Sequence, residues 1–198
     1  MAKIKNKKTG LFFGSFNPIH IGHLIIANHM VSDTDLDEVW LVVSPHNPLK
    51  DKSSLANDYD RLHMVELALE DSVNLKASKV EFALQKPSYT IDTLTYLEEK
   101  YPNKSFCIIM GGDSLVSLPK WKNYNKLLQH HEIYVYNRPD SNTSDLPFDI
   151  QNITFVDAPL IDLSATYIRD RILNSKSVKY ILPDKVFEFI DSKRLYSI

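Results

Sequence analysis

GSFNPIHIGH, which runs from Gly14 to His23, is the stretch from which the fold can be inferred. It follows the apolar run Gly10–Phe13, which is short enough to be a buried strand, and it opens a segment with helical spacing from about His20 to Met30. The start of a helix leaves backbone N–H groups unpaired and carries roughly half a positive charge, so it attracts phosphate groups. The stretch therefore predicts a strand, a tight turn and a helix that binds an anion.

Two histidines make this stretch more specific. His20 and His23 are three residues apart, so they share one face of the predicted helix. Their imidazoles can donate hydrogen bonds to phosphate oxygens, and nearby anions would favour the protonated rings. Gly14 would allow the sharp turn, and Gly22 would leave room for a phosphate against the helix. The alternative is a pair of structural histidines at a helix start.

Apolar runs and helical patterns alternate along the rest of the chain. The pattern predicts further strands at 39–43, 80–84, 105–110, 133–136 and 153–156, further helices at 61–69, 91–97, 123–128, 164–173 and 183–190, and loops at 44–57 and 140–149. This alternation favours a parallel sheet with helices on both faces, whose ligands bind at the carboxyl ends of the strands. The loops after Phe13, Val43 and Met110 are therefore expected to share one site.

Length and composition point to one domain that binds a small molecule. The chain has 198 residues, 43% of them hydrophobic, which is enough for a single domain over 1–198 with a basic N-terminal tail at 1–8. The net charge of -2 gives no general attraction to nucleic acid or to membranes. No apolar run approaches a membrane span, so a cytoplasmic location is expected. Cys107 is expected to be buried, and no zinc-site spacing or other protein metal site is expected.

The stretch from Gly14 to His23 is similar to the G-x-F-x-P-x-H-x-G-H signature of the nucleotidyltransferase superfamily, and it matches every fixed position. The resemblance implies a Rossmann-like domain. It also implies that His20 and His23 contact triphosphate oxygens and stabilise charge in the transition state. On the same basis, Gly14, Ser15 and Phe16 are expected to bind ATP.

A second segment, Leu163–Arg169, resembles the superfamily motif I-S-S-T-x-I-R. Ser164 and Thr166 offer hydroxyl groups at a helix start and are expected to bind ATP. Arg169 follows about one turn later and can form bidentate bonds to phosphate, so it is a candidate catalytic residue. Leu163 and Ala165 depart from the motif, which leaves open whether position 165 contacts phosphate through its backbone. The alternative is an ordinary capped helix with a surface arginine.

A closer resemblance covers residues 9 to about 190 and points to the bacterial nicotinate mononucleotide adenylyltransferases. Residues 88–94 resemble the family segment S-Y-T-x-D-T-L, residues 111–115 with Trp121 resemble G-x-D-S-L…W, and residues 45–50 resemble the loop P-x-x-x-P-P-H-K, although Leu49 replaces its usual histidine. The resemblance implies transfer of the adenylyl group of ATP to nicotinate mononucleotide, with Mg²⁺ on the triphosphate.

The resemblance also implies roles for five residues. Trp121 would stack on the nicotinate ring, and Tyr89 and Thr90 would hold its carboxylate at a helix start. Asp113 would bond a ribose hydroxyl, and Lys50 would reach the triphosphate. The alternatives are a core tryptophan, two helix-capping roles and a solvated lysine.

Two arginines that match family positions receive no chemical role. Arg61 is interpreted as a structural, salt-bridged residue, and Arg138, in an Arg-Pro pair after a strand, is assigned no chemistry. Because the attacking phosphate is already ionised, no catalytic carboxylate is expected. The preference between nicotinate and nicotinamide mononucleotide and the oligomeric state stay open.

Three other functions share part of this sequence pattern. A phosphopantetheine adenylyltransferase or a cytidylyltransferase would share the histidine motif without the 88–94 segment, Asp113 and Trp121. A non-enzymatic nucleotide-binding module would bind ATP without releasing pyrophosphate. A tRNA synthetase is disfavoured, because the chain leaves no room for an anticodon-binding domain and is not basic.

Overall fold

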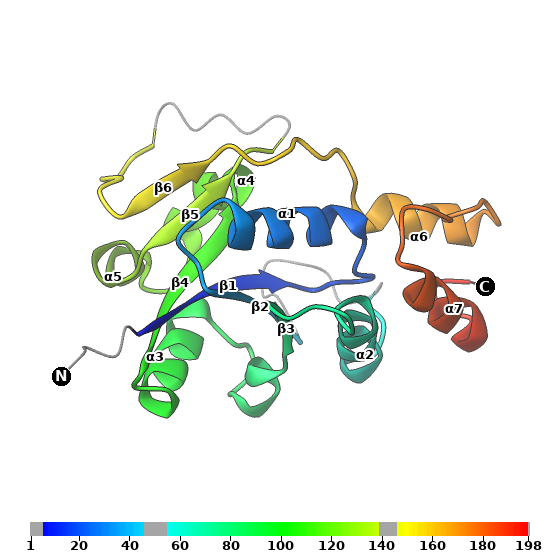
Figure 1. The fold of residues 1–198 in the computed structure, drawn as a ribbon, viewed down its shortest axis with the longest axis horizontal. Helices are drawn as coiled ribbons and strands as arrows, with labels where there is room; N and C mark the ends of the chain where they lie inside the picture. The colour runs from blue at the N-terminus through cyan, green and yellow to red at the C-terminus, as the bar shows by residue number, and fades with distance from the viewer. Residues whose placement is uncertain (1–5, 46–54, 139–145, 198) are drawn as a thin grey trace.

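A six-stranded parallel sheet forms the centre of the molecule. The computed structural model describes residues 6–45, 55–138 and 146–197, and in it the strands lie in the order β3-β2-β1-β4-β5-β6 (Figure 1). The strands are β1 (Lys7–Gly14), β2 (Glu38–Val43), β3 (Leu75–Ser78), β4 (Lys104–Gly111), β5 (Ile133–Tyr136) and β6 (Ile153–Val156). The order reverses between β1 and β4, and ligands of such sheets bind outside the carboxyl ends of the strands at this point.

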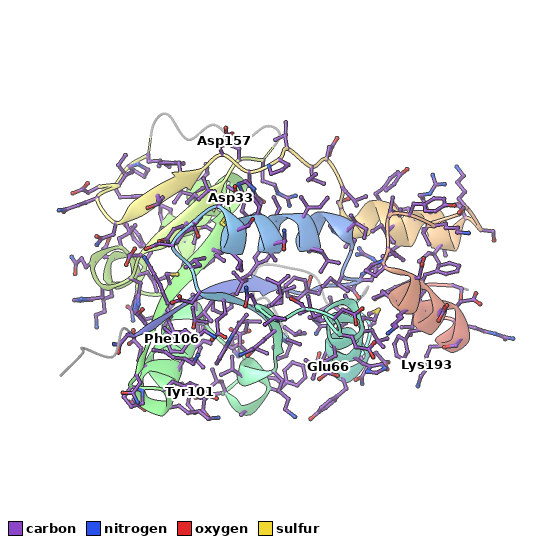
Figure 2. The ribbon with its side chains drawn as sticks, viewed as in Figure 1. Asp33, Glu66, Tyr101, Phe106, Asp157 and Lys193 are labelled. Atoms are coloured by element: carbon purple, nitrogen blue, oxygen red, sulfur yellow. The ribbon has the colours of Figure 1, made fainter. Side chains whose placement is uncertain are left out.

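Helices cover both faces of the sheet, as the sequence predicts. They are α1 (Ile21–Ser32), α2 (Asp58–Ala68), α3 (Thr90–Lys100), α4 (Gly112–Ser117), α5 (Tyr124–His130), α6 (Ala165–Leu173) and α7 (Asp184–Lys193), with 3₁₀ turns η1 (Val80–Ala83) and η2 (Leu118–Lys120). Strand side chains alternate between faces, so Leu41 joins a core with α1, α2, α6 and α7, while Val42 joins a second core with α3, α4 and α5. Tyr101 and Phe106 pack edge to face in the second core (Figure 2).

Two predicted elements differ from the structure. The strand expected at 80–84 is wrong: Val80–Ala83 forms η1, and the strand β3 lies just before it. Residues 75–78 contain only Leu75 and Ala77 as apolar residues, so they carry little strand pattern by themselves. Their strand conformation comes from parallel pairing with β2. In η1, Glu81 turns inward and accepts a hydrogen bond from Thr93, a contact that the local sequence does not reveal.

The amino end of the sheet begins earlier than expected. β1 includes Lys7 and Lys8, so the assignment of residues 1–8 to a tail is wrong for these two. Lys8 pairs with Asp35 and Glu132. A second cluster, the Glu38 cluster, consists of the fully buried Glu38 carboxylate and the ammonium groups of Lys7, Lys76 and Lys104. Charges at this end of the sheet are therefore fixed by partners within the chain.

The described part of the chain contains no helix long and apolar enough to span a membrane. Cys107 is buried in β4, as expected, and burial raises the pKa of its thiol to about 12. Most of the predicted loops at 44–57 and 140–149 lie outside the described residues.

Candidate active site

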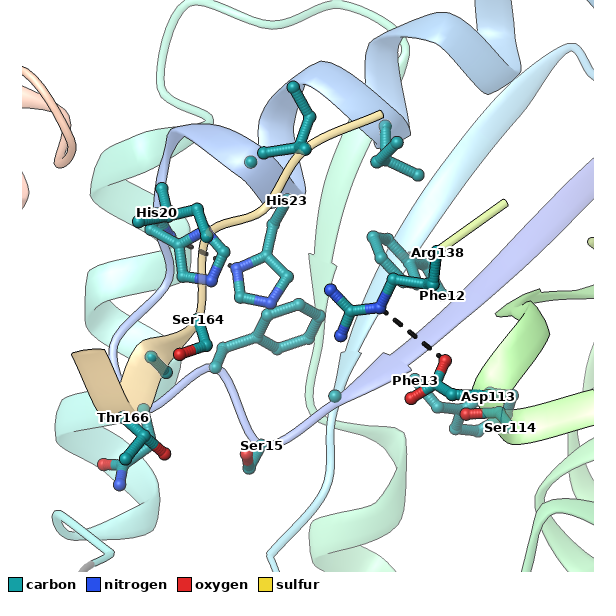
Figure 3. Close-up of a pocket in the computed structure, with 18 of the residues that line it drawn as sticks. Phe12, Phe13, Ser15, His20, His23, Asp113, Ser114, Arg138, Ser164 and Thr166 are labelled. Carbon is teal, nitrogen blue, oxygen red and sulfur yellow. Dashed lines mark hydrogen bonds and ion pairs between the residues drawn. The ribbon is translucent and has the colours of Figure 1, made fainter. Parts of the chain in front are cut away.

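A cavity of about 360 Å³ lies at the carboxyl ends of β1 and β4, where the strand order reverses (Figure 3). The segment after β1, the start of α4, the segment after β5 and the start of α6 all contribute to its wall. Nine of the predicted site residues line it: Gly14, Ser15, Phe16, His20, His23, Asp113, Ser164, Thr166 and Arg169. The expected convergence of the segments after β1 and β4 with the segment of Arg169 is confirmed. Of the loop after β2, Leu55 is among the lining residues and residues 46–54 lie outside the described part of the chain, so the share of this loop in the site stays a prediction.

His20 and His23 form a stacked pair on one side of this cavity. Their ring centroids are 3.7 Å apart with an angle of 29° between the planes. The backbone N–H of His20 donates to Nδ1 of His23 at 3.3 Å. Because that nitrogen accepts, a neutral His23 carries its proton on Nε2 and can donate from there. Figure 3 shows both rings between the start of α1 and the side chain of Arg138.

The protonation state of His20 in the ligand-free protein follows from its surroundings. Burial, and secondarily the charge of Arg138, lower the pKa of His20 to about 4, so the ring is neutral at physiological pH. The expectation of protonated rings concerns histidines beside bound triphosphate oxygens, and it stays a prediction. The Nδ1 atom of His20 is buried and lacks a hydrogen-bond partner among the described residues. Buried polar atoms in this situation usually serve a ligand, a water molecule or a reaction.

Gly14 and Gly22 are needed because they leave room for neighbouring rings, and neither has a left-handed backbone. A Cβ on Gly14 would lie 2.8 Å from the Phe16 ring, and a Cβ on Gly22 would lie 3.1 Å from Nδ1 of His20. Gly22 therefore makes room for the His20 ring, where the sequence suggested room for a phosphate. The left-handed backbone belongs instead to Phe16, with φ 43°. Such a conformation is unfavourable for a bulky residue and is typical of functional sites.

The first turn of α1 offers fewer free donors than the sequence suggests. The Ile21 N–H donates to the carbonyl of Ile181 at 3.1 Å, and the His20 N–H is used by His23. These contacts tie the start of α1 to the segment before α7. Anion binding at this helix start therefore depends more on the histidine side chains than on these two backbone groups.

Arg169 lies on the same cavity as the histidine pair. Its guanidinium donates to the Asn17 carbonyl at 2.9 Å and to the Thr166 hydroxyl at 3.2 Å. Ser164 caps α6, since its hydroxyl accepts from the Tyr167 N–H at 3.2 Å. Both readings of the second motif are thus present: the helix is capped, and its arginine faces the cavity rather than solvent alone.

Arg138 is a cavity residue that the sequence analysis missed. It follows β5, lines the cavity, and places Nε 3.6 Å from the carboxylate of Asp113 (Figure 3). Asp113 lies in the first turn of α4, whose N-cap residue is Gly111. Applying the rule of strand carboxyl ends to β5 as well would have identified Arg138.

The predicted mononucleotide residues other than Asp113 lie outside the cavity lining but next to one another. Tyr89 is the N-cap residue of α3 and Thr90 its first residue. Lys122, beside Trp121, sits 4.7 Å from the centre of the Tyr89 ring. Trp121 packs in part against the second core, so it combines contact with the core and an accessible face. The structure thus brings the two segments together at the start of α3.

Arg61 is structural, as predicted. The side chain is fully buried and its guanidinium donates to the carbonyls of Ser44 at 2.9 Å, Ala56 at 3.1 Å and Ser15. It also forms an ion pair with Asp58 at 2.7 Å. This arginine fixes the cavity loop to α2. Lys50, the remaining predicted ATP contact, lies outside the described residues.

Comparisons with known proteins agree with this geometry. A family model described as cytidylyltransferase-like matches residues 11–171. A probable nicotinate-nucleotide adenylyltransferase from Flavobacterium psychrophilum is 53% identical over 190 residues, which cover 96% of this chain and 98% of that protein. The chain belongs to the nicotinate-nucleotide adenylyltransferase family.

More distant members of this family are also similar. A probable nicotinate-nucleotide adenylyltransferase from Bacillus licheniformis is 35% identical over 96% of this chain and 98% of its own length. The Plasmodium falciparum nicotinic acid mononucleotide adenylyltransferase, solved with NaAD, aligns with a TM-score of 0.79 over 96% of this chain and 97% of that one. Its identity of 17% supports the fold alone.

Proposed function

We propose that this protein transfers the adenylyl group of ATP to nicotinate mononucleotide, giving nicotinate adenine dinucleotide and pyrophosphate in NAD biosynthesis. The observation that carries the proposal is the convergence of His20, His23 and Arg169 on one cavity at the switch point of the sheet. The relatives that share half of the sequence carry the name of this activity.

The reaction is an in-line displacement at the α-phosphorus of ATP. An oxygen of the mononucleotide phosphate forms a bond to that phosphorus, and the bond to the pyrophosphate oxygen breaks. The attacking oxygen is already ionised, so no base has to remove a proton. Negative charge grows on the leaving group and on the oxygens of the transferred phosphate, and fixed donors lower the barrier by stabilising it.

Four side chains of the cavity can supply this stabilisation. His23 donates from Nε2, and neutral His20 offers one ring N–H, while Arg169 and Arg138 bring permanent charge. Triphosphate oxygens beside the histidines would raise their pKa values and favour the charged rings. Binding of ATP is therefore accompanied by proton uptake at His20 below neutral pH.

Magnesium enters with the triphosphate. Among the described residues no three His, Cys, Asp or Glu side chains are grouped to hold a metal ion. Mg²⁺ commonly keeps its waters and binds substrate phosphates with one or two carboxylates, and Asp113 is a carboxylate on the cavity wall. Such a metal would partly neutralise the triphosphate.

The mononucleotide is assigned to the start of α3. Tyr89 and Thr90 would meet the nicotinate carboxylate, Trp121 would stack on its ring, and Asp113 would bond a ribose. Glu81 supports this helix start by accepting a hydrogen bond from Thr93 at 2.9 Å, and burial raises the pKa of its carboxyl. The contacts of Gly14, Ser15, Phe16, Ser164 and Thr166 with ATP, and of Lys50 with its triphosphate, stay part of this proposal.

The test is pyrophosphate release from ATP and Mg²⁺ with each acceptor in turn: nicotinate mononucleotide, nicotinamide mononucleotide, phosphopantetheine, and no acceptor. Turnover with nicotinate mononucleotide, and dinucleotide formed in equal amount to pyrophosphate, is expected. Turnover with phosphopantetheine alone would assign the protein to a sibling activity. ATP binding without pyrophosphate release from any acceptor would favour a binding module.

A further inference from the structure

Asn17 connects the cavity loop to three distant parts of the chain. It is 2% exposed and occupies a position that the ten-residue signature leaves variable. Its backbone carbonyl accepts from Nη1 of Arg169 at 2.9 Å. Its side-chain oxygen accepts from the Ala56 N–H at 3.0 Å and from the Tyr196 hydroxyl at 2.8 Å. One residue thus joins the catalytic arginine to a tyrosine 179 positions later.

Tyr196 is held in place for this contact. It follows α7 and has a left-handed backbone, with φ 64°, as does Arg194, with φ 51°. Residues other than glycine rarely adopt the left-handed backbone conformation unless the surrounding structure fixes it. The ring packs against the first core, and burial raises the pKa of the Tyr196 phenol, so the hydroxyl stays a donor at physiological pH. The guanidinium groups of Arg169 and Arg61 are close enough to oppose that rise.

We infer that Tyr196 is a positioning residue of the adenylyl transfer, a role that rests on the proposed function. Its hydroxyl fixes the side chain of Asn17, and the carbonyl of Asn17 then holds the Arg169 guanidinium toward the cavity. The hydrogen bonds of Arg169 to Asn17 and Thr166 use two of its five N–H donors and set the direction of the others. Small displacements of a positioned group can reduce turnover by a large factor.

The substitution Tyr196→Phe tests this role, because it removes only the hydroxyl and keeps the buried ring. We expect kcat to fall roughly tenfold, with KM for nicotinate mononucleotide changed by less than about twofold, since the lost contact acts on Arg169 rather than on the acceptor site. The control Tyr180→Phe removes a hydroxyl from a ring that is 81% exposed, and it should leave kcat unchanged. A lower melting temperature with normal kcat in Tyr196→Phe would overturn the inference.

A double-mutant cycle separates positioning from general destabilisation. In an Arg169→Ala background, Tyr196→Phe should change kcat by less than about twofold, because the group that it positions is already absent. An equal tenfold loss in both backgrounds would contradict the inference, since independent effects multiply.

A measurement without substrate turnover distinguishes failure of this inference from failure of the proposed function. In ¹⁵N-arginine-labelled protein, the Nε–Hε signal of Arg169, assigned with Arg169→Lys, should shift or broaden in Tyr196→Phe and stay in place in Tyr180→Phe. If wild type turns over no nicotinate mononucleotide, the proposed function fails, and the inferred role in adenylyl transfer fails with it. The Arg169 signal still shows in that case whether Tyr196 fixes the guanidinium. An unchanged signal in Tyr196→Phe would overturn the inference even where turnover is normal.

Discussion

The two ends of the sheet differ in whether their buried ionisable side chains have partners among the described residues. At the amino end, Glu38 is fully buried and meets three lysines, and the pKa of its carboxyl is held well below the usual range by Lys104, Lys76, Lys7 and Thr9 against the effect of burial. At the carboxyl end, His20 is buried, its Nδ1 has no hydrogen-bond partner within residues 6–45, 55–138 and 146–197, and its pKa falls to about 4.

This difference distinguishes side chains that stabilise the fold from side chains that are available to bind a ligand. Buried charges with partners are internally satisfied and change little when a substrate binds. A buried polar group without a partner destabilises the folded protein and can recover that loss in a complex. Substitutions at the amino end should therefore affect stability alone, and those at the carboxyl end should affect catalysis most.

The largest expected effect comes from His20→Ala. Removing one fixed donor should reduce kcat by roughly 10²–10³, which corresponds to ~2.7–4 kcal/mol of transition-state stabilisation. Pyrophosphate release at saturating substrates measures it. Turnover within a fewfold of wild type would show that His20 is not catalytic and would contradict the contrast between the two ends.

The pH dependence of stability tests the buried state of His20. Its pKa lies below that of an unfolded histidine, near 6.5, so the unfolded chain binds more protons between about pH 4 and pH 6.5. The contribution of neutral His20 to the free energy of unfolding is fully present above pH 6.5 and is lost as the pH falls towards 4. Between pH 7 and pH 5 this histidine should remove about 2 kcal/mol from the free energy of unfolding.

Urea titrations at the two pH values measure this loss. His20→Gln should abolish most of it, whereas His63→Gln, at a half-exposed surface position, should retain it. Equal pH dependence in wild type and His20→Gln would show that another group dominates the window; His131, whose pKa burial also lowers, is the next candidate.

At the amino end, Glu38→Gln should lower the free energy of unfolding by about 1–2 kcal/mol. The loss is moderate because Lys7 and Lys76 are about half exposed and can turn to water. Turnover per folded molecule should equal that of wild type. A large fall in kcat for this variant would mean that the two ends are coupled, and the comparison drawn above would fail.

The smallest effect is expected at Ser164. Ser164→Ala removes the cap of α6 and should cost about 1 kcal/mol of stability, whereas Ser164→Gly should cost only a few tenths. If the hydroxyl also binds the triphosphate, KM for ATP should rise equally in both variants. A KM that rises only in the alanine variant would restrict Ser164 to its capping role.

Local features were predictable from the sequence, and long-range contacts were not. The strand, turn and helix around Gly14–His23 follow from the periodicity of neighbouring residues, and so does the N-cap at Ser164. The rule for parallel sheets then places the cavity at strand ends. The pair of Arg138 with Asp113 and the contact of Asn17 with Tyr196 join residues far apart in sequence, so no local pattern reports them.

Protonation and fine packing were also beyond the sequence. The low pKa of His20 arises from burial and from Arg138, neither of which is visible in the ten-residue stretch. The strand β3 was missed because its conformation comes from pairing with β2, and η1 replaced the expected strand because Glu81 turns inward to Thr93.

Arg61 has a consequence for engineering of this chain. One guanidinium holds the carbonyls of Ser44 and Pro45 on one side of residues 46–54 and that of Ala56 on the other. Both flanks of this segment are therefore fastened at the same point, independently of the number of residues between them. A peptide tag inserted after Lys50, which is itself the proposed triphosphate contact, should therefore leave both flanks held by Arg61.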